Sequence, residues 1–186
     1  MSRRLSSELF RACGVGFLLL LALSSNSLSL GKENAGAGSA VDPKTGLKLP
    51  ARLGAFDRYG PIEYDPNGDP MGTYRAGALI LLNLYYYKND FSFSQEFANC
   101  RDEVKIVQPA ARLLSDEPSR LQGAGRRAVF TFQGKFSGGP NQKLSSELLI
   151  FPHRGRFLKF RVTYPAVHAE RARTEIDAFV RSLKLP

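Results

Sequence analysis

The chain has 186 residues, a formal net charge of +9 and 43% hydrophobic side chains, which is enough for one ordinary folded domain. Two cysteines are too few for a disulfide-rich scaffold, and the wide separation of the two histidines disfavours a zinc site. The positive excess lies in residues 120–186, which hold thirteen basic and four acidic side chains. Such an asymmetry indicates either an anionic partner or a soluble protein with a basic flank.

Residues 1–24 have the layout of a cleavable signal peptide. Arg3 and Arg4 precede an apolar run of ten residues, Gly14 to Leu23, and small residues follow it. That run is about half of the roughly 20 residues that a helix needs to span a bilayer, which disfavours the alternative of a short uncleaved anchor. Cleavage would leave Cys100 as the only cysteine. We therefore expect an exported protein, periplasmic or secreted, with no transmembrane helix in the mature chain.

The next segment, residues 25–47, is rich in Ser, Gly, Ala and Asn, so we expect a flexible tether. A single domain is expected over residues 48–186. It begins with a strand over residues 55–64, in which Phe56, Ile62 and Tyr64 are the expected buried positions.

A dense turn signal, Asp65 to Pro70, comes next and leads into a second short strand over residues 71–77. Residues 78–87 are apolar at both alternating sets of positions, which predicts a strand in the middle of a sheet that is covered on both faces. Residues 90–107 change to helical spacing, with a capping-box pattern at Ser92 and a stop at Pro109.

The second half predicts a meander of three strands over residues 127–136, 146–151 and 157–164, preceded by a weak strand signal at residues 111–115, and a closing helix over residues 166–184. Strands that follow one another in sequence favour antiparallel pairing. The predicted fold class is therefore α+β: a single domain with a mainly antiparallel sheet of about six strands and two helices packed on it, in the order β-β-β-α-β-β-β-α.

No arrangement of residues forms a known catalytic signature. Cys100 with His153 or His168 is a conceivable nucleophile pair, but Cys100 falls on the apolar stripe of the predicted helix, which favours a buried structural role. Asp65, Asn67 and Asp69 occupy the first ligand positions of a calcium loop, yet Pro70 replaces its glycine and Ala76 its bidentate glutamate. We expect no cofactor, no metal and no nucleic-acid partner.

Basic residues of the predicted strands form the one candidate binding site. Alternation places Leu158, Phe160, Val162 and Tyr164 on one side of their strand and Phe157, Lys159, Arg161 and Thr163 on the other. If the strands pair in sequence order, Arg127 and Lys135 share a surface with Lys159 and Arg161, and Arg156 lies at its edge. The candidate residues are Lys159, Arg161, Arg127 and Arg156. The alternative is that they are solvated or paired with acids such as Glu147.

Short motifs along the domain resemble a family of uncharacterised exported bacterial proteins. They are Leu49-Pro50-x-x-Leu53-Gly54-x-Phe56-x-Arg58, Tyr74, Phe157-x-Lys159-x-Arg161-x-Thr163-Tyr164-Pro165, and Phe179. The polar turn at residues 65–70 departs from that pattern. The order of elements is also similar to that of PsbP-like domains. The family resemblance implies no activity, and the PsbP likeness concerns architecture alone.

The sequence therefore favours a non-enzymatic binding or accessory protein of the cell envelope. Its expected partner is an anionic envelope component: a lipid, a polymer or an acidic protein. Two alternatives remain open. One is a hydrolase-like enzyme whose site is assembled from dispersed residues, and the other is a periplasmic chaperone-like module.

Overall fold

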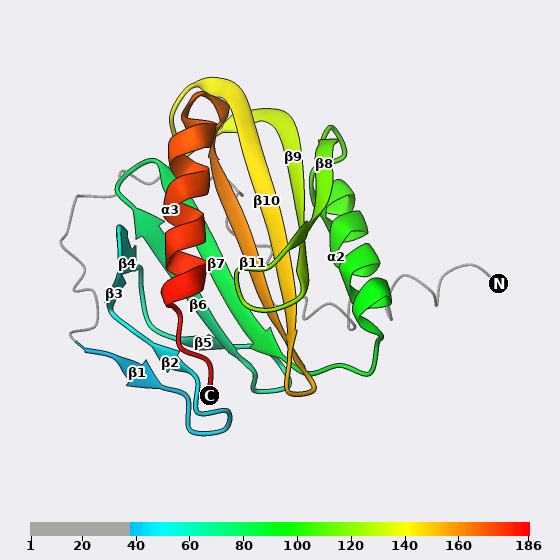
Figure 1. Ribbon diagram of the computed structural model, residues 1–186. Helices are drawn as coiled ribbons and strands as arrows, with labels where there is room; N and C mark the ends of the chain where they lie inside the picture. Colours follow the sequence, from blue (N-terminus) through cyan, green and yellow to red (C-terminus); the bar gives the residue numbers. More distant parts are fainter. Residues whose placement is uncertain (1–37) are drawn as a thin grey trace.

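The computed structural model describes residues 38–186. The expected signal peptide and residues 25–37 of the expected tether lie outside the described residues. The described chain forms two helices, a short 3-10 turn and eleven strands, so its fold class is α+β, as predicted. Figure 1 shows the two helices packed against one large sheet, with a small hairpin at its lower edge.

The large sheet is antiparallel and has nine strands, in the order β3-β4-β6-β7-β11-β10-β9-β8, with β5 also paired to β6. Their bounds are β3 Arg52–Leu53, β4 Phe56–Arg58, β5 Glu63–Tyr64, β6 Pro70–Ala76, β7 Ile80–Tyr87, β8 Arg112–Ser119, β9 Gly125–Lys135, β10 Asn141–His153 and β11 Arg156–Pro165. A separate pair is formed by β1 Ala40–Val41 and β2 Lys48–Leu49.

The predicted count of about six strands is wrong, as is the predicted order of elements. Seven strands precede the first described helix, α2 (Phe93–Val107), and four lie between it and α3 (Ala169–Ser182). The extra strands escaped the sequence analysis because those of two or three residues are too short to show an alternating pattern. The expected strand over residues 55–64 is split into β4 and β5 by residues 59–62, with a bend at Gly60.

The segment before β2 is folded onto the domain from Ala40 onward. The Asp42 carboxylate accepts hydrogen bonds from the Thr45 backbone N–H at 2.6 Å and from the Thr45 hydroxyl at 2.5 Å, which closes the turn between β1 and β2. Leu47, at the end of this turn, is completely buried in the core. The last residues of the expected tether are therefore part of the ordered structure.

Strand β7 lies at the centre of the fold, as its two apolar sets predict. It pairs with β6 on one side and with β11 on the other, and its two faces enter two different cores. Leu82, Leu84 and Tyr86 join the core beneath α3, whereas Tyr87 joins the core beneath α2.

Helix α2 confirms the capping signal in the sequence. The Ser92 side chain accepts from the Gln95 backbone N–H, and the Gln95 side chain accepts from the Ser92 backbone N–H. Its apolar stripe, which includes Phe97, Cys100 and Val104, is buried against β9 and β10. Lys159 on β11 contacts Cys100 and Glu103, so α2 lies on the face to which Lys159 points.

Helix α3 covers the opposite face of the sheet and the larger core. The Phe179 ring makes edge contacts with the rings of Phe56, Tyr74 and Phe160, with centroids 5.0, 4.9 and 6.2 Å away. Phe160 follows Lys159 on β11, and successive residues of a strand point to opposite faces. The fold therefore has three layers: α2, the sheet and α3. We call the two sides of the sheet the α2 face and the α3 face.

Candidate functional site

The four basic residues singled out in the sequence are divided between the two faces. The register with β10, the strand between β9 and β11, shows this division. Arg127 pairs with Leu149 of β10, whereas Lys159 pairs with the next residue, Ile150. Because neighbouring residues of a strand point in opposite directions, Arg127 lies on the α3 face and Lys159 on the α2 face. The strands do pair in sequence order, but the expectation that Arg127 shares a surface with Lys159 and Arg161 does not hold.

Arg127 belongs to a buried ion-pair network under α3. Its side chain is only 3% exposed, its Nε lies 3.0 Å from Glu147 Oε2, and it also pairs with Asp177 of α3. The Tyr164 hydroxyl donates to Glu147 Oε1 at 2.5 Å, and burial, helped by this carboxylate, raises the pKa of Tyr164. Arg127 thus ties three elements together and presents almost no surface to a partner.

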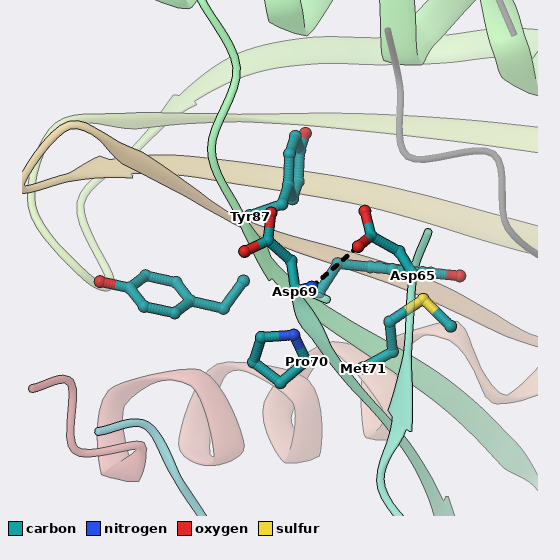
Figure 2. A pocket seen from close by; sticks show the side chains of 7 residues that line it. Asp65, Asp69, Pro70, Met71 and Tyr87 are labelled. Atoms are coloured by element: carbon teal, nitrogen blue, oxygen red, sulfur yellow. Dashed lines mark hydrogen bonds between the residues drawn. The ribbon is translucent and has the colours of Figure 1, made fainter. Parts of the chain in front are cut away.

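Arg156 anchors the polar turn between β5 and β6 from the α3 face. Its NH1 donates to Asp69 Oδ1 at 2.9 Å, and Lys44 lies 3.4 Å from the same oxygen. Asp65 Oδ1 accepts from the backbone N–H groups of Asn67 and Asp69, at 2.9 and 2.8 Å. Figure 2 shows the second of these bonds. This carboxylate is already occupied by the turn's own backbone, which explains the calcium-like spacing as turn chemistry.

The depression beside this turn is lined by Pro70, Met71 and three consecutive tyrosines of β7, together with Asp65 and Asp69. Its cavity volume is about 10 Å³, which is scarcely room for one water molecule, so the depression does not define a ligand pocket.

Lys159 is buried beneath α2. Its side chain is 3% exposed, and its Nζ lies 3.6 Å from Glu103 Oε2 and 3.8 Å from Cys100 Sγ. The same ammonium is 4.8 Å from the centre of the Tyr85 ring and 5.3 Å from that of Tyr87, which adds cation–π attraction. Lys159 is therefore part of the interior of the α2 layer.

A polar cluster continues from Lys159 toward the start of α2. The Tyr87 hydroxyl and the Cys100 thiol both donate to Glu96 Oε1, the latter at 3.2 Å, and Asn89 donates to Glu96 Oε2 at 2.5 Å. Burial, with the nearby Cys100 and Glu96, raises the pKa of Tyr87 well above its ordinary value of 10.0. Glu96 is fully buried but has three donors, so the cluster is consistent with a structural role.

Arg161 differs from the other predicted residues. It is half-buried on the α2 face, two residues beyond Lys159 on β11. It forms no ion pair with residues 38–186. Its Nε is buried and has no hydrogen-bond partner in that part of the chain. Its cross-strand neighbour on β7 is Asn83, whose side-chain oxygen accepts from the Thr73 hydroxyl at 3.0 Å.

A second arginine of this kind lies two strands away. Arg75, on β6, pairs with Leu81 of β7, and Leu81 also faces Thr163 of β11. The Arg75 guanidinium stacks on the Tyr59 ring at 3.9 Å, and no ion pair joins it to residues 38–186. Its cross-strand acid, Asp57, pairs instead with Arg52 at 3.6 Å.

We call these residues of the α2 face the sheet patch. Its members are polar or aromatic, come from β6, β7, β11 and the end of β4, and lie beyond Lys159: Tyr59, Thr73, Arg75, Asn83, Arg161 and Thr163. The sequence analysis found Arg161 but missed Arg75. Alternation within residues 71–77 puts Arg75 on the polar side, but only the order β6-β7-β11 brings it near Arg161.

The candidate nucleophiles and bases do not assemble into a site. His153 contacts the Pro186 carbonyl at 3.2 Å at the tip of the β10–β11 hairpin, and His168 lies in the 3-10 turn Ala166–His168 before α3. Within residues 38–186, neither histidine hydrogen-bonds to Cys100, which is buried under α2. The same residues contain no cluster of three or more metal-ligating side chains and no helix of a length and apolarity that would cross a membrane.

The comparisons with known proteins support the fold alone. No protein family model matches the chain, and no curated protein matches its sequence. The solution structure of cyanobacterial PsbP (CyanoP) from Synechocystis sp. PCC 6803 is similar, with 12% identity and a TM-score of 0.50 over 89% of this chain and 99% of that one. This shows a PsbP-like fold.

A more distant likeness is to LpqN of Mycobacterium tuberculosis, a protein described as involved in cell envelope biogenesis. Its identity is 13% and its TM-score 0.45, over 75% of this chain and 82% of that one. A similarity at this level supports no inference about function.

The residues that carry the family resemblance are mostly core residues in the structure. Leu49, Phe56 and Phe179 of α3 are buried in the same core, and Arg58 donates to the Leu49 carbonyl at 2.6 Å. These motif positions therefore hold β2, β4 and α3 together.

Proposed function

We propose that this protein is an exported, non-enzymatic accessory protein of the cell envelope, and that it binds an anionic partner through the sheet patch. The observation that carries the proposal is the pair of arginines on one face, Arg75 and Arg161, that form no ion pair with residues 38–186. Export rests on the signal-like pattern of residues 1–24.

An arginine with a buried, unsatisfied Nε is unfavourable unless an anion compensates it. Removing a guanidinium from water costs free energy, and a charge-assisted hydrogen bond to a carboxylate or phosphate recovers it. The Nε atoms of Arg58, Arg101, Arg127 and Arg161 are all in this condition. The guanidinium groups of Arg101 and Arg127 lie beside carboxylates and that of Arg58 donates to the Leu49 carbonyl, whereas Arg161 has no carboxylate partner among residues 38–186. The unpaired state of Arg161 therefore favours a ligand role for this residue over a structural one.

The surroundings of the two arginines suit recognition of a polar anion. Thr73, Asn83 and Thr163 lie between or beside them and supply hydroxyl and amide groups. Lys159 adds positive charge at the border of the patch, partly compensated by Glu103. In this proposal Lys159 makes the electrostatic potential of the patch more positive. Arg127 and Arg156 form ion pairs that stabilise the α3 face and do not contact the partner.

The test is retention on an immobilised polyanion, dextran sulfate, across a series of salt concentrations. Arg161→Gln and Arg75→Gln should each elute at clearly lower salt than the unchanged protein, because each removes a charge from the patch. Arg112→Gln is the matched control, since it removes the same charge from an exposed residue of β8, whose partner Thr131 points to the α3 face.

Equal shifts for the patch variants and the control would mean that the protein binds by net charge alone, and would overturn the proposal.

Fractionation of cells that express the full chain, with an Arg3→Glu, Arg4→Glu variant beside it, tests export separately. The unchanged protein should be recovered outside the cytoplasm and the variant inside it.

A further inference from the structure

We propose that the anionic partner is a glycan chain, a polymer of sugar units that carry carboxylate or phosphate groups, lying across β6, β7 and β11. This inference rests on the proposed function and specifies its ligand. The feature that points to a sugar is an exposed Tyr59 stacked on Arg75, on the same face of the sheet as Arg161.

Tyr59 supplies the aromatic surface that a pyranose needs. It follows β4, its backbone N–H donates to the Thr73 carbonyl at 2.7 Å, and its side chain is 50% exposed. Arg75 stacks on one face of the ring at 3.9 Å, so in this inference the sugar packs on the opposite face. The C–H groups on one side of a sugar ring pack on an aromatic face, while its hydroxyls bond to side chains such as Thr73 and Asn83.

The spacing of the arginines fits a repeating anion. Arg75 and Arg161 lie on β6 and β11, with β7 between them. Strands are about 4.8 Å apart, which separates the two backbones by roughly 10 Å across the sheet, and the pairing offsets the two residues by a further two positions, about 7 Å, along the strands. The two Cα positions are therefore roughly 12 Å apart, a distance that a disaccharide unit and two long arginine side chains can span when alternate sugar units point the same way.

The composition of the patch disfavours a lipid surface. Binding to a bilayer typically combines protruding lysines with apolar side chains that enter the headgroup region. Here the cations are half-buried arginines, and Tyr59 is the one exposed large hydrophobic residue, among those described, that belongs to the patch. A thin polymer that lies on the strands reaches such guanidinium groups more easily than a membrane does.

The acids near the patch lie at its borders and leave the arginines positive. Asp57 pairs with Arg52 at the β3–β4 border, and Glu103 pairs with Lys159 at the α2 border. Glu63, on β5, faces Met71 rather than either arginine. The two bordering acids are thus each matched by a basic residue, and Arg75 and Arg161 remain for the ligand.

The experiment is isothermal titration of the purified protein with four probes: oligogalacturonate, a phosphomannan fragment, a neutral maltooligosaccharide and sugar-free polyphosphate. At least one acidic glycan should bind more tightly than both polyphosphate and the neutral glycan. The two acidic glycans distinguish carboxylate from phosphate as the recognised group. Arg161→Gln should weaken glycan binding by about tenfold, the usual scale of one charge-assisted hydrogen bond.

Tyr59 separates the glycan inference from general anion binding. Tyr59→Leu should weaken glycan binding several-fold and leave polyphosphate binding unchanged. Tyr59→Phe, which keeps the ring, should bind the glycan as tightly as the unchanged protein does. Anionic vesicles of phosphatidylglycerol serve as a fifth probe.

The outcomes are distinguishable. If polyphosphate or the vesicles bind as tightly as the acidic glycans and Tyr59→Leu has no effect, the glycan inference fails while the proposed function stands, provided that Arg161→Gln still weakens binding. If no anionic probe binds, or if Arg161→Gln and Arg112→Gln behave alike, both fail.

Discussion

The arginines of the sheet patch differ from those of the α3 face in their partners. On the α3 face, Arg127 is held by Glu147 and Asp177, and Arg156 is held by Asp69. On the α2 face, Arg75 and Arg161 form no ion pair with residues 38–186. The same residue type thus pairs with carboxylates on the α3 face and lacks a carboxylate partner among residues 38–186 in the sheet patch, and composition alone does not tell the two apart.

The cores beneath the two helices also differ, in size and in polarity. The α3 core contains twenty buried residues and most of the large aromatic side chains, whereas the α2 core contains nine. The α2 layer also encloses the polar cluster of Glu96, Tyr87, Cys100 and Lys159. We therefore expect the α3 face to dominate stability and the α2 face to dominate recognition. The following four experiments test that division, in order of expected effect on stability.

Replacement of Phe179 by Ala should cause the largest loss. This side chain is 1% exposed and touches three aromatic rings of the α3 core. Deletion of a buried Phe costs about 3–5 kcal/mol of unfolding free energy. Urea denaturation measures the change, and Val167→Ala, at a residue 83% exposed, is the control. A loss below about 1 kcal/mol would show that the α3 core is not the main source of stability.

Replacement of Arg127 by Ala should cost about 3 kcal/mol, since it leaves Glu147 buried without its cation. The double variant Arg127→Met, Glu147→Leu should recover much of the loss, because it removes both charges and keeps the volume. Denaturation of the single and double variants tests this. The folded double variant should bind polyanions as the unchanged protein does, and a specific loss of binding would contradict the division between the faces.

Alkaline pH should weaken the fold through its buried tyrosines. Burial raises the pKa of Tyr87 well above 10.0, and burial, opposed by Arg58, raises that of Tyr74 to about 12. In the unfolded chain these hydroxyls ionise near pH 10, so their contribution is fully present below that pH and is lost as the pH rises toward the raised values.

The variant Tyr87→Phe isolates one of these groups. At neutral pH it should be less stable by about 1 kcal/mol, because Glu96 loses a donor. The difference from the unchanged protein should shrink above pH 10, since the variant lacks the group that ionises on unfolding. Urea midpoints measured at neutral pH and above pH 10 give both values, and a constant difference would contradict the assignment.

Replacement of Arg161 by Gln should change stability least, by less than about 0.5 kcal/mol, because no ion pair with residues 38–186 is lost. Its effect on binding to dextran sulfate should nevertheless exceed that of Arg127→Met, Glu147→Leu. Thermal unfolding and retention measured on the same samples test both statements. A large loss of stability would show that Arg161 has a structural role.

Several elements were predictable because their signals are local. The Ser92 capping box and the helical spacing of Phe97, Cys100 and Val104 specify α2 without reference to distant residues. The two apolar sets of residues 78–87 specify a central strand for the same reason. Local signals did not predict the short strands, because β1 to β5 have two or three residues each. Tyr64, which was expected in the core, lies in one of these strands and is 50% exposed.

The sequence by itself determined the α+β class, the positions of the longer strands and helices, and the alternation that separates Lys159 and Arg161 from Phe160, because each depends on the period of side chains along one segment. Only the tertiary structure decided which cations share a face. That depends on strand order and register, which place Arg127 opposite Leu149 and bring Arg75 within two strands of Arg161. A shift of register by one residue would exchange the faces, and the pattern within a single strand contains no information about its partner.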